Sequence, residues 1–214
     1  MKNQEEEIIE YKKWRKEYKH QTDDRIAVIN YLIQKFNYKR YLEIGILSGY
    51  CFEKIIIEHK DGVDPNSYPF VNYVMTSDEF FNQLKKDYKY DIIFIDGLHY
   101  DYQIYIDINN ALDHLSHNGI ILCHDMNPIF EIFQEKKPIV TCWTGDCWKA
   151  FIKLRSERND LEMFVINIDF GVGLIRKGKQ EIINIPEKLN YEFLDKNRKN
   201  ILNLITLEDF YKKI

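Results

Sequence analysis

Short apolar runs alternate with amphipathic stretches along most of the chain. Residues 90–95 and 120–123 are apolar runs of the kind found in strands buried on both faces. Shorter strand patterns precede them, at 40–45, 61–64 and 73–75. Between these strands, apolar residues recur at helical spacing over 22–36, 48–58, 79–87 and 102–115. This alternation predicts a doubly wound α/β fold around a parallel sheet.

The two ends of the chain carry different patterns. Residues 1–20 are rich in charge and have apolar residues at roughly helical spacing, which predicts an amphipathic helix. After a helix expected over 147–158, strands at 161–168 and 172–176 flank Asp169-Phe170-Gly171. That arrangement predicts a hairpin, and hence one antiparallel strand in the sheet. A last helix is expected over 207–213.

We therefore expect a single domain in three parts. They are N-terminal helices in 1–39, the core of the domain in 40–178, and a tail with a helix in 179–214. The N-terminal helix and the aromatic-bearing tail have more apolar residues than free arms need, which predicts a homodimer.

Composition narrows the class of protein. The 214 residues are 45% hydrophobic and 30% charged with a formal net charge of -4, which predicts a soluble globular protein without a nucleic-acid partner. The charged N-terminus is unlike a secretory signal, and no apolar run is long enough for a bilayer, so no membrane partner is expected. The four cysteines form no CxxC pair, which favours reduced thiols in a cytoplasmic protein over a zinc site.

A glycine-containing turn follows the first predicted strand, at Glu43-Ile44-Gly45-Ile46-Leu47-Ser48-Gly49. Gly45 and Gly49 allow the backbone to approach a ligand closely, and the start of the next helix offers free N–H groups. A pyrophosphate site would favour GxGxxG, and the acidic Glu43 would repel phosphate. The turn therefore suits a cationic ligand such as S-adenosylmethionine, with an ordinary strand-to-helix turn as the alternative.

Acidic residues also end the next two predicted strands. Asp64 lies 21 residues after Glu43, where an acid can accept hydrogen bonds from both hydroxyls of a ribose. The alternative is a solvated carboxylate that caps the turn at Pro65. Ser77 and Asp78 follow the third strand and are candidates for the adenine side of a nucleoside, although Ser77 is as well suited to be a helix N-cap.

Polar clusters follow the two buried strands. Asp96 and His99 come after 90–95, and His124 and Asp125 come after 120–123. Because the carboxyl ends of parallel strands meet at the cleft, we expect these side chains to converge. They could deprotonate a hydroxyl or bind a divalent ion, and the alternative is capping and loop hydrogen bonding.

Several stretches together resemble a known family, the small bacterial class I methyltransferases labelled methyltransferase-24. These stretches are Tyr41–Ile46, Met75–Phe81, Ile95–Tyr100, His124–Pro128, Trp143–Phe151 and Asp169–Gly173. The resemblance covers about residues 40–178 and implies a seven-stranded sheet of order 3-2-1-4-5-7-6. It also implies S-adenosylmethionine bound by the Glu43–Gly49 turn, Asp64 and the Ser77-Asp78 region, with Asp96 beside it.

The resemblance implies a substrate class as well. Relatives in this broad group methylate hydroxyls of sugars, including capsule sugars, so the acceptor expected here is a small molecule, a sugar or sugar nucleotide. Some related sugar enzymes hold Mg²⁺ between strand-end carboxylates, which makes Asp96 and Asp125 candidate metal ligands. His124 stands where such enzymes can have a second acid.

Residue chemistry agrees with methylation of a hydroxyl. A neutral histidine oriented by an acid can take the proton of an attacking alcohol. His99 is the expected base, with Asp96 or Asp125 orienting its ring, and His124 is the next candidate. Candidates for acceptor binding are Trp143, Asp146, Trp148 and Lys149, which offer aromatic faces, an acid and a base. The alternative is a loop that its two tryptophans anchor in the core.

Two other classes of function stay open. One is a methyltransferase for another small molecule, such as a phosphoramidate, an amine or a lipid-linked glycan. The other is a non-catalytic domain that binds the nucleoside or a partner chain. A nicotinamide oxidoreductase is disfavoured because GxGxxG is missing.

Overall fold

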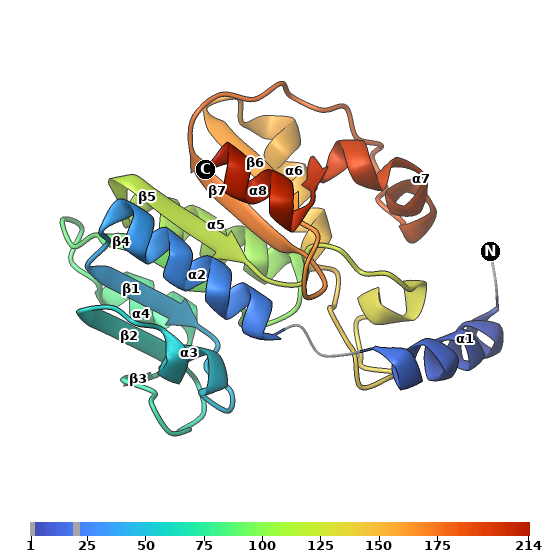
Figure 1. The fold of residues 1–214 in the computed structure, drawn as a ribbon, viewed down its shortest axis with the longest axis horizontal. Helices are drawn as coiled ribbons and strands as arrows, with labels where there is room; N and C mark the ends of the chain where they lie inside the picture. The colour runs from blue at the N-terminus through green and yellow to red at the C-terminus, as the bar shows by residue number, and fades with distance from the viewer. Residues whose placement is uncertain (1–2, 19–21) are drawn as a thin grey trace.

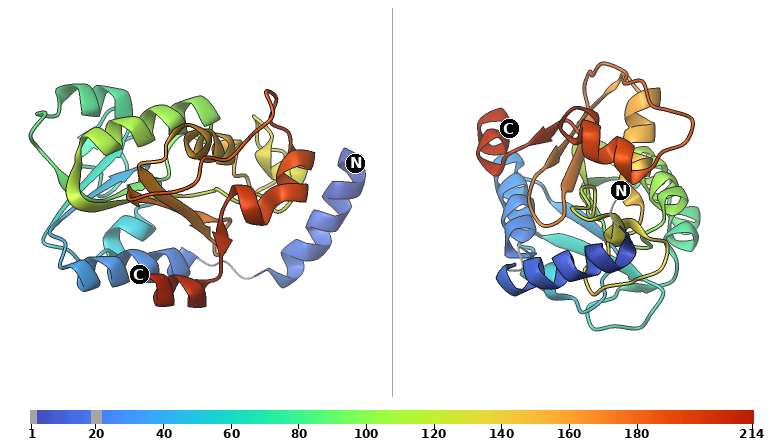
Figure 2. Two further views of the ribbon diagram at one scale, coloured as in Figure 1. Left: turned by 90° about the horizontal axis from the view of Figure 1, so that it is seen from above. Right: turned by 90° about the vertical axis from the view of Figure 1, so that its right-hand side faces the viewer.

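An eight-stranded sheet runs through the protein and carries helices on both faces (Figures 1 and 2). The computed structural model describes residues 3–18 and 22–214. The strand order is β3-β2-β1-β4-β5-β7-β6-β8, and β7 runs antiparallel to both of its neighbours. The strands are β1 (Arg40–Ile44), β2 (His59–Asp64), β3 (Tyr73–Val74), β4 (Tyr90–Ile95), β5 (Leu115–Cys123), β6 (Leu161–Ile166), β7 (Val172–Lys177) and β8 (Leu204–Ile205).

Helices cover the sheet in two layers. One face is covered by α4 (Ser77–Gln83), α5 (Asp101–Asp113), α6 (Cys147–Glu157) and α7 (Tyr191–Ile201). The opposite face is covered by α2 (Thr22–Phe36), α3 (Tyr50–Lys54) and α8 (Leu207–Lys213). The left view of Figure 2 shows the sheet between these layers. Helix α1 (Gln4–Glu17) and the 3₁₀ helix η1 (Glu131–Gln134) lie together outside them.

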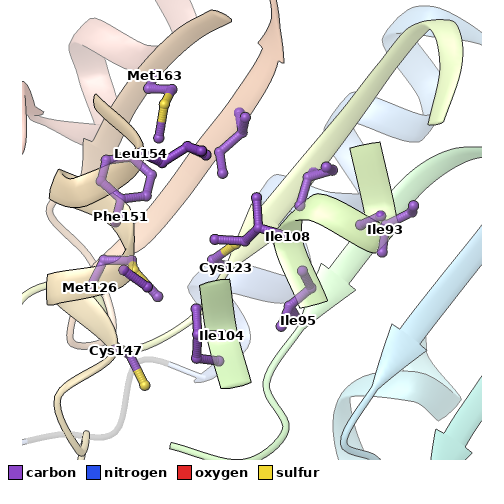
Figure 3. Packing of buried hydrophobic residues seen from close by; sticks show 14 of the residues in the cluster. Ile93, Ile95, Ile104, Ile108, Cys123, Met126, Cys147, Phe151, Leu154 and Met163 are labelled. Carbon is purple, nitrogen blue, oxygen red and sulfur yellow. The ribbon is translucent and has the colours of Figure 1, made fainter. Parts of the chain in front are cut away.

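The alternation of strand side chains divides the core. On β4, Ile93 and Ile95 face α5, where they meet Ile104 and Ile108 (Figure 3), whereas Phe94 faces the α2 layer. All five side chains are at most 1% exposed. Successive strand residues point to opposite faces, so a strand between two helical layers must be apolar at every position. This requirement produces the apolar runs by which the central strands are predicted.

The predicted order of the first seven strands is confirmed, and the sheet has one strand more than expected. The tail contains α7 and β8 in addition to the predicted last helix. Strand β8 has two residues and pairs with β6, so its own sequence is too short to show a strand pattern. The guanidinium of Arg155 on α6 donates hydrogen bonds to the last carbonyls of α7, at Asn200 and Ile201. These partners are distant in sequence, which explains why the tail elements were not predicted.

Other differences from the predictions are local. The side chain that caps α4 is Thr76, through a capping box with Glu79, and not Ser77. Strand β5 begins at Leu115, five residues before the apolar run at 120–123. Its pairing with β4 shifts between Tyr90 and Ile92, which is an irregularity within the strand. Helix α3 spans five residues, which is shorter than the predicted 48–58.

The amphipathic helix predicted near the N-terminus is present as α1, and it packs on η1. Glu7 accepts hydrogen bonds from the backbone N–H groups of Glu131 (2.7 Å) and Ile132 (3.1 Å). The rings of Tyr11 and Trp14 contact Phe133 with centroid separations of 5.7 and 5.8 Å. The predicted residues 1–2 and 19–20 lie outside the described residues. Within the described ranges, no helix is both long enough and apolar enough to cross a membrane.

The last helix is an integral part of the core. Phe210 on α8 is 0% exposed and packs in the cluster formed by α2 and the strands. We expect Phe210→Ala to lower the free energy of unfolding by about 3–5 kcal/mol, because it leaves a large cavity in that cluster. Thermal denaturation should show a midpoint about 10 °C lower.

The neighbouring Tyr211→Ala is the matched control, because Tyr211 is 40% exposed. It should change the midpoint much less. Equal effects of the two substitutions would contradict the placement of Phe210 in the core.

Candidate active site

A cavity of about 380 Å³ opens where the carboxyl ends of the central strands meet. Its walls come from the turn after β1, the ends of β2 and β4, and the first turns of α4 and α5. The sheet order places these segments side by side, because the connections after β1 and β4 leave in opposite directions at that point. The cavity is therefore at the topological switch point, where open α/β sheets bind ligands.

Gly45 makes the close approach of two strand ends sterically feasible. Its φ is +88°, and a Cβ atom there would lie 2.2 Å from the carbonyl oxygen of Asp96. Hydrogen bonds from Gly45 N to the Val63 carbonyl (2.8 Å) and from Asp96 N to the Ile44 carbonyl (2.8 Å) hold these strand ends together. Only glycine fits both this conformation and this space. Gly45 lines the cavity, as predicted from its place in the turn.

Asp64 lines the cavity from the end of β2 and is 7% exposed. Its Oδ2 atom accepts hydrogen bonds from the backbone N–H groups of Ile46 (3.1 Å) and Leu47 (3.3 Å). Its Oδ1 atom accepts one from Asn66 N at 2.8 Å. The carboxylate thus stabilises the turn after β1 and also faces the cavity. Both uses that the sequence left open, turn cap and ligand contact, remain compatible with this position.

Two predicted cofactor residues lie outside the cavity wall. Glu43 is 1% exposed and accepts a hydrogen bond from the hydroxyl of Tyr41 below the turn. Gly49 is the N-cap of α3, and a Cβ atom there would lie 2.4 Å from the Phe70 ring. Both residues support the turn and neither is among those that line the cavity, so direct ligand contact by Glu43 or Gly49 stays a prediction.

Burial dominates the electrostatics of Glu43. Its pKa is raised to about 8, mainly because a charged carboxylate would be desolvated there. Glu43 therefore keeps its proton at neutral pH. Direct charge attraction of a cationic ligand, the role suggested by the sequence, needs an ionised group, so this role is not supported.

Ser77 and Asp78 line the far end of the cavity together with Gln103 of α5. The Gln103 Nε2 atom donates hydrogen bonds to Asp78 Oδ1 (3.2 Å) and to Ser77 Oγ (3.4 Å). Gln103 was not among the predicted site residues. Its sequence signal, a polar residue in the first turn of a helix, is too common to identify a site.

A polar cluster closes the near end of the cavity. His99 Nε2 lies 3.5 Å from Asp96 Oδ1, and His99 Nδ1 lies 3.2 Å from Asp125 Oδ2. His124 Nδ1 lies 3.1 Å from Asp96 Oδ1 and 3.3 Å from Asp125 Oδ2. The four residues predicted from the ends of two strands are thus in mutual contact, and Asp96 and His99 also line the cavity.

Two further charged residues complete this cluster. Arg25 of α2 is within 2.8 Å of Asp169 Oδ2 and 3.5 Å of Asp96 Oδ2. Asp169 lies in the β6–β7 turn, 3.3 Å from His124 Nε2. Sequence analysis did not assign a role to either residue. A signal existed for Arg25, which falls on the apolar stripe of its helix one turn before Val28 and Ile29.

The carboxylates determine the protonation of both histidines. Burial lowers the pKa of His99, but Asp125 and Asp96 outweigh it, and the pKa lies above the ordinary histidine value. Burial and the approach of Arg25 (2.8 Å to Nε2) likewise oppose protonation of His124. Asp125 and Asp96 again prevail, so the His124 pKa is raised well above its usual range. The cluster therefore favours positive charge on its imidazoles.

The cluster also has the donor set of a cation site. Ligand atoms of Asp96, His124 and Asp125 all lie within 4.8 Å of one another. When both imidazoles are neutral, the carboxylates of Asp96, Asp125 and Asp169 face one positive charge, that of Arg25, so a divalent cation that displaces the imidazole protons would offset the remaining negative charge. These residues fit such an ion. The imidazole nitrogen suits Mn²⁺ or another transition metal better than the Mg²⁺ expected from the sequence, because Mg²⁺ prefers oxygen ligands.

The predicted acceptor residues separate into two groups. The Trp143 ring stacks on His99, with centroids 5.0 Å apart, and is half-buried. Trp148 is 0% exposed, and its indole donates to Gln134 Oε1 at 2.8 Å. Of the four, only Trp143 lies against the polar cluster, which corrects the expectation for Trp148: it anchors the loop in the core.

Asp146 and Lys149 form a pair at the start of α6. Asp146 is 1% exposed, accepts a hydrogen bond from Asp101 N (3.0 Å) and forms an ion pair with Lys149 (3.1 Å). Asp146 therefore caps the first turn of α5 and does not face the cavity. The loop passes directly over the histidine, because a Cβ atom on Gly145 would lie 1.9 Å from the His99 carbonyl oxygen.

Comparison with known proteins agrees with this geometry. Residues 56–126, about a third of the chain, match the model of the methyltransferase-24 family, which is described as a methyltransferase domain. This segment of the chain is similar to a methyltransferase domain. The family resemblance inferred from the sequence is thereby confirmed. No curated protein matches this chain.

Solved structures share the fold. The O-methyltransferase TomG from Streptomyces achromogenes, in complex with S-adenosylmethionine, superposes with a TM-score of 0.56 and 14% identity, over 72% of this chain and 79% of TomG. A Podospora anserina methyltransferase bound to S-adenosylhomocysteine superposes with a TM-score of 0.52 and 18% identity, over 81% of this chain and 88% of that enzyme. An O-methyltransferase from Bacillus cereus, also with S-adenosylhomocysteine, superposes with a TM-score of 0.52 and 15% identity, over 71% of this chain and 79% of that enzyme. The class I methyltransferase fold predicted from the sequence is confirmed.

Glu43 makes the stability of this protein depend on pH. The unfolded chain loses the Glu43 proton near the ordinary value of 4.5, whereas the folded protein keeps it up to about pH 8. Stability from this group is thus fully present below about pH 4.5 and is lost as pH rises towards 8. Glu43→Gln retains an acceptor for Tyr41 and cannot ionise. At pH 8 we expect this variant to have a free energy of unfolding higher than wild type by on the order of 2–4 kcal/mol, and therefore an unfolding temperature several degrees higher. At pH 5 the difference should be small.

Thermal denaturation at pH 5, 6.5 and 8 measures this effect. The exposed Glu187 supplies the control, and Glu187→Gln should follow the wild-type pH profile. A Glu43→Gln profile parallel to wild type would show that Glu43 is ionised in the folded protein.

Proposed function

We propose that this protein transfers the methyl group of S-adenosylmethionine to a hydroxyl of a small-molecule acceptor, a sugar or sugar nucleotide. The observation that carries the proposal is the continuity between the cavity and the polar cluster. The cavity wall combines Asp64, Ser77 and Asp78, which suit a nucleoside, with Asp96 and His99 of the polar cluster. A cofactor in the cavity would thus direct its reactive end to an imidazole supported by carboxylates.

The cavity has features that suit this cofactor. Asp64 lies at the end of β2, where an acid can bind ribose hydroxyls, and Ser77 and Asp78 are at the far end. The structures of TomG and of the Bacillus cereus enzyme, which share the fold, contain S-adenosylmethionine and S-adenosylhomocysteine. A cationic sulfonium would also be attracted by the negative charge of Asp96 and Asp125.

The reaction needs a base and good alignment. A hydroxyl oxygen attacks the methyl carbon in line with the carbon–sulfur bond, the bonding pair goes to sulfur, and the hydroxyl proton must leave. His99 is the base in this proposal, because its ring lines the cavity between Asp96 and Asp125. It acts in its neutral form, and the two carboxylates that raise its pKa then stabilise the imidazolium that forms. Gly145 and Trp143 pack against His99 and hold its ring in place.

The acceptor class rests on the resemblance and on Trp143. Its indole lies beside the base and offers a large amphipathic surface of the kind that packs on a sugar ring. A divalent cation held by Asp96, His124 and Asp125 would stabilise the alkoxide form of the acceptor. The homodimer and the cytoplasmic location stay predictions.

Loss of His99 tests the proposal. We expect His99→Ala to lower the rate of methyl transfer by roughly 10²–10⁴, the usual range for a general base, with little change in affinity for S-adenosylmethionine. Transfer is measured with methyl-labelled S-adenosylmethionine and a panel of nucleotide sugars, and affinity by calorimetry.

The exposed His117 is the matched control, and His117→Ala should behave as wild type. Near-normal transfer by the His99 variant would place the base elsewhere. Binding of the cofactor without transfer to any nucleotide sugar would contradict the acceptor class. Absence of S-adenosylmethionine binding to wild type would contradict the proposed function as a whole.

Metal binding is tested separately from activity. We expect Mn²⁺ to raise the thermal midpoint of the protein, and Mg²⁺ to raise it less, because an ion that binds only the folded state stabilises it. Asp125→Asn should abolish the shift, whereas the exposed Asp113→Asn should retain it. The absence of a shift with either ion at millimolar concentration would contradict the site.

A further inference from the structure

The orientation of the Gln103 amide is set by acids at the far end of the cavity. Its Nε2 atom lies 3.1 Å from Asp107 Oδ1 and 3.2 Å from Asp78 Oδ1. An ionised carboxylate can only accept hydrogen bonds, so the NH₂ group of Gln103 must face the two acids. The amide is planar, and its oxygen therefore points away from them.

Burial of the Asp107 carboxylate lowers the stability of the fold. Asp107 is 0% exposed, and in the described part of the chain its Oδ2 atom has no hydrogen-bond partner. Burial raises the pKa of Asp107 to about 6, so the group is still mostly ionised at pH 7.5. A buried charge with an unpaired oxygen lowers stability, and an apolar residue would suit this helix position better. Asp107 accepts a hydrogen bond from Gln103, one helical turn away, so the buried charge orients the Gln103 amide.

The surroundings of Gln103 suit a flat heteroaromatic ring. Gln103 lines the cavity together with the apolar side chains of Met75 and Leu98. Apolar walls accept the faces of a ring, and polar groups at the edge select its substituents. An amide oxygen there would accept a hydrogen bond from an exocyclic amine and would repel a carbonyl oxygen.

We propose that Gln103, with its amide oriented by Asp107 and Asp78, recognises the exocyclic amine of adenine and makes the cavity selective for adenine over hypoxanthine. This inference rests on the proposed function, because it assumes that S-adenosylmethionine occupies the cavity. Gln103 is the specificity-determining residue, and Asp107 is a positioning residue that acts through it.

Two ligands that differ at one position test the inference. S-adenosylhomocysteine carries the amine, and S-inosylhomocysteine carries an oxygen in its place. Calorimetry at pH 7.5 should show wild type binding S-adenosylhomocysteine roughly 10²-fold more tightly, because the inosyl oxygen would leave the Gln103 oxygen unpaired. Gln103→Met has similar length and no hydrogen-bonding group. It should reduce this preference to less than about 10-fold.

Asp107→Asn tests the positioning role. An Asn side chain can accept or donate, so only Asp78 still constrains the orientation of the Gln103 amide. We expect a preference between those of wild type and Gln103→Met. If Asp107 had a purely structural role, its substitution would weaken the binding of both ligands equally and leave the ratio of their affinities unchanged. Asn110→Met, two turns further along the same face of α5 and outside the cavity wall, is the control and should retain the wild-type ratio.

The outcomes separate this inference from the proposed function. Failure of wild type to bind S-adenosylhomocysteine would overturn both. Tight binding of S-adenosylhomocysteine together with equal binding of the inosyl analogue would overturn the inference alone. An unchanged preference in Gln103→Met would do the same.

Discussion

The buried guanidinium of Arg25 holds together the parts of the chain that form the site. It reaches from α2, which covers one face of the sheet, to Asp96 at the end of β4 and Asp169 in the β6–β7 turn. Its side chain is 14% exposed, and those of the two acids are 17% and 3% exposed. Removal of one partner from such a cluster leaves charge uncompensated in a poorly solvated place, at a cost of about 3–5 kcal/mol. The relative positions of helix, strand end and turn are therefore coupled through this ion-pair network.

The backbone of the site depends on the same region. Asp125 has a φ of 64°, a left-handed conformation that costs energy for a residue other than glycine or asparagine. The residues after it are held by hydrogen bonds from Met126 N to the Gly171 carbonyl (3.0 Å) and from Asn127 N to the Phe170 carbonyl (2.7 Å). The β6–β7 turn thus supports the loop that carries His124 and Asp125. Its aromatic residue Phe170 in turn contacts Phe133 beneath α1, which connects the N-terminal helix to this support.

The cavity and the cluster divide the chemistry between them. The far end combines apolar walls with the Gln103 amide and suits the recognition of a neutral ring. The near end holds three carboxylates, one guanidinium and two imidazoles, and suits charge and proton movement. Gly45 makes this arrangement compact, because β1 and β4 touch where no side chain could fit. Glu43, which sequence analysis placed at the ligand, instead stays protonated beneath the turn.

The sequence by itself determined the elements whose signal is local. Strand β4 and helix α8 have the predicted bounds, because burial on both faces and a regular apolar stripe each leave a pattern within one segment. The convergence of Asp96, His99, His124 and Asp125 also followed, since neighbouring parallel strands end at one edge. Tertiary structure alone decided which polar residues join them. Arg25, Gln103 and Asp169 come from two helices and a turn, and their partners are distant in sequence or arranged by the fold. No local pattern identifies those partners, although Arg25 is marked by its place on the apolar stripe of its helix.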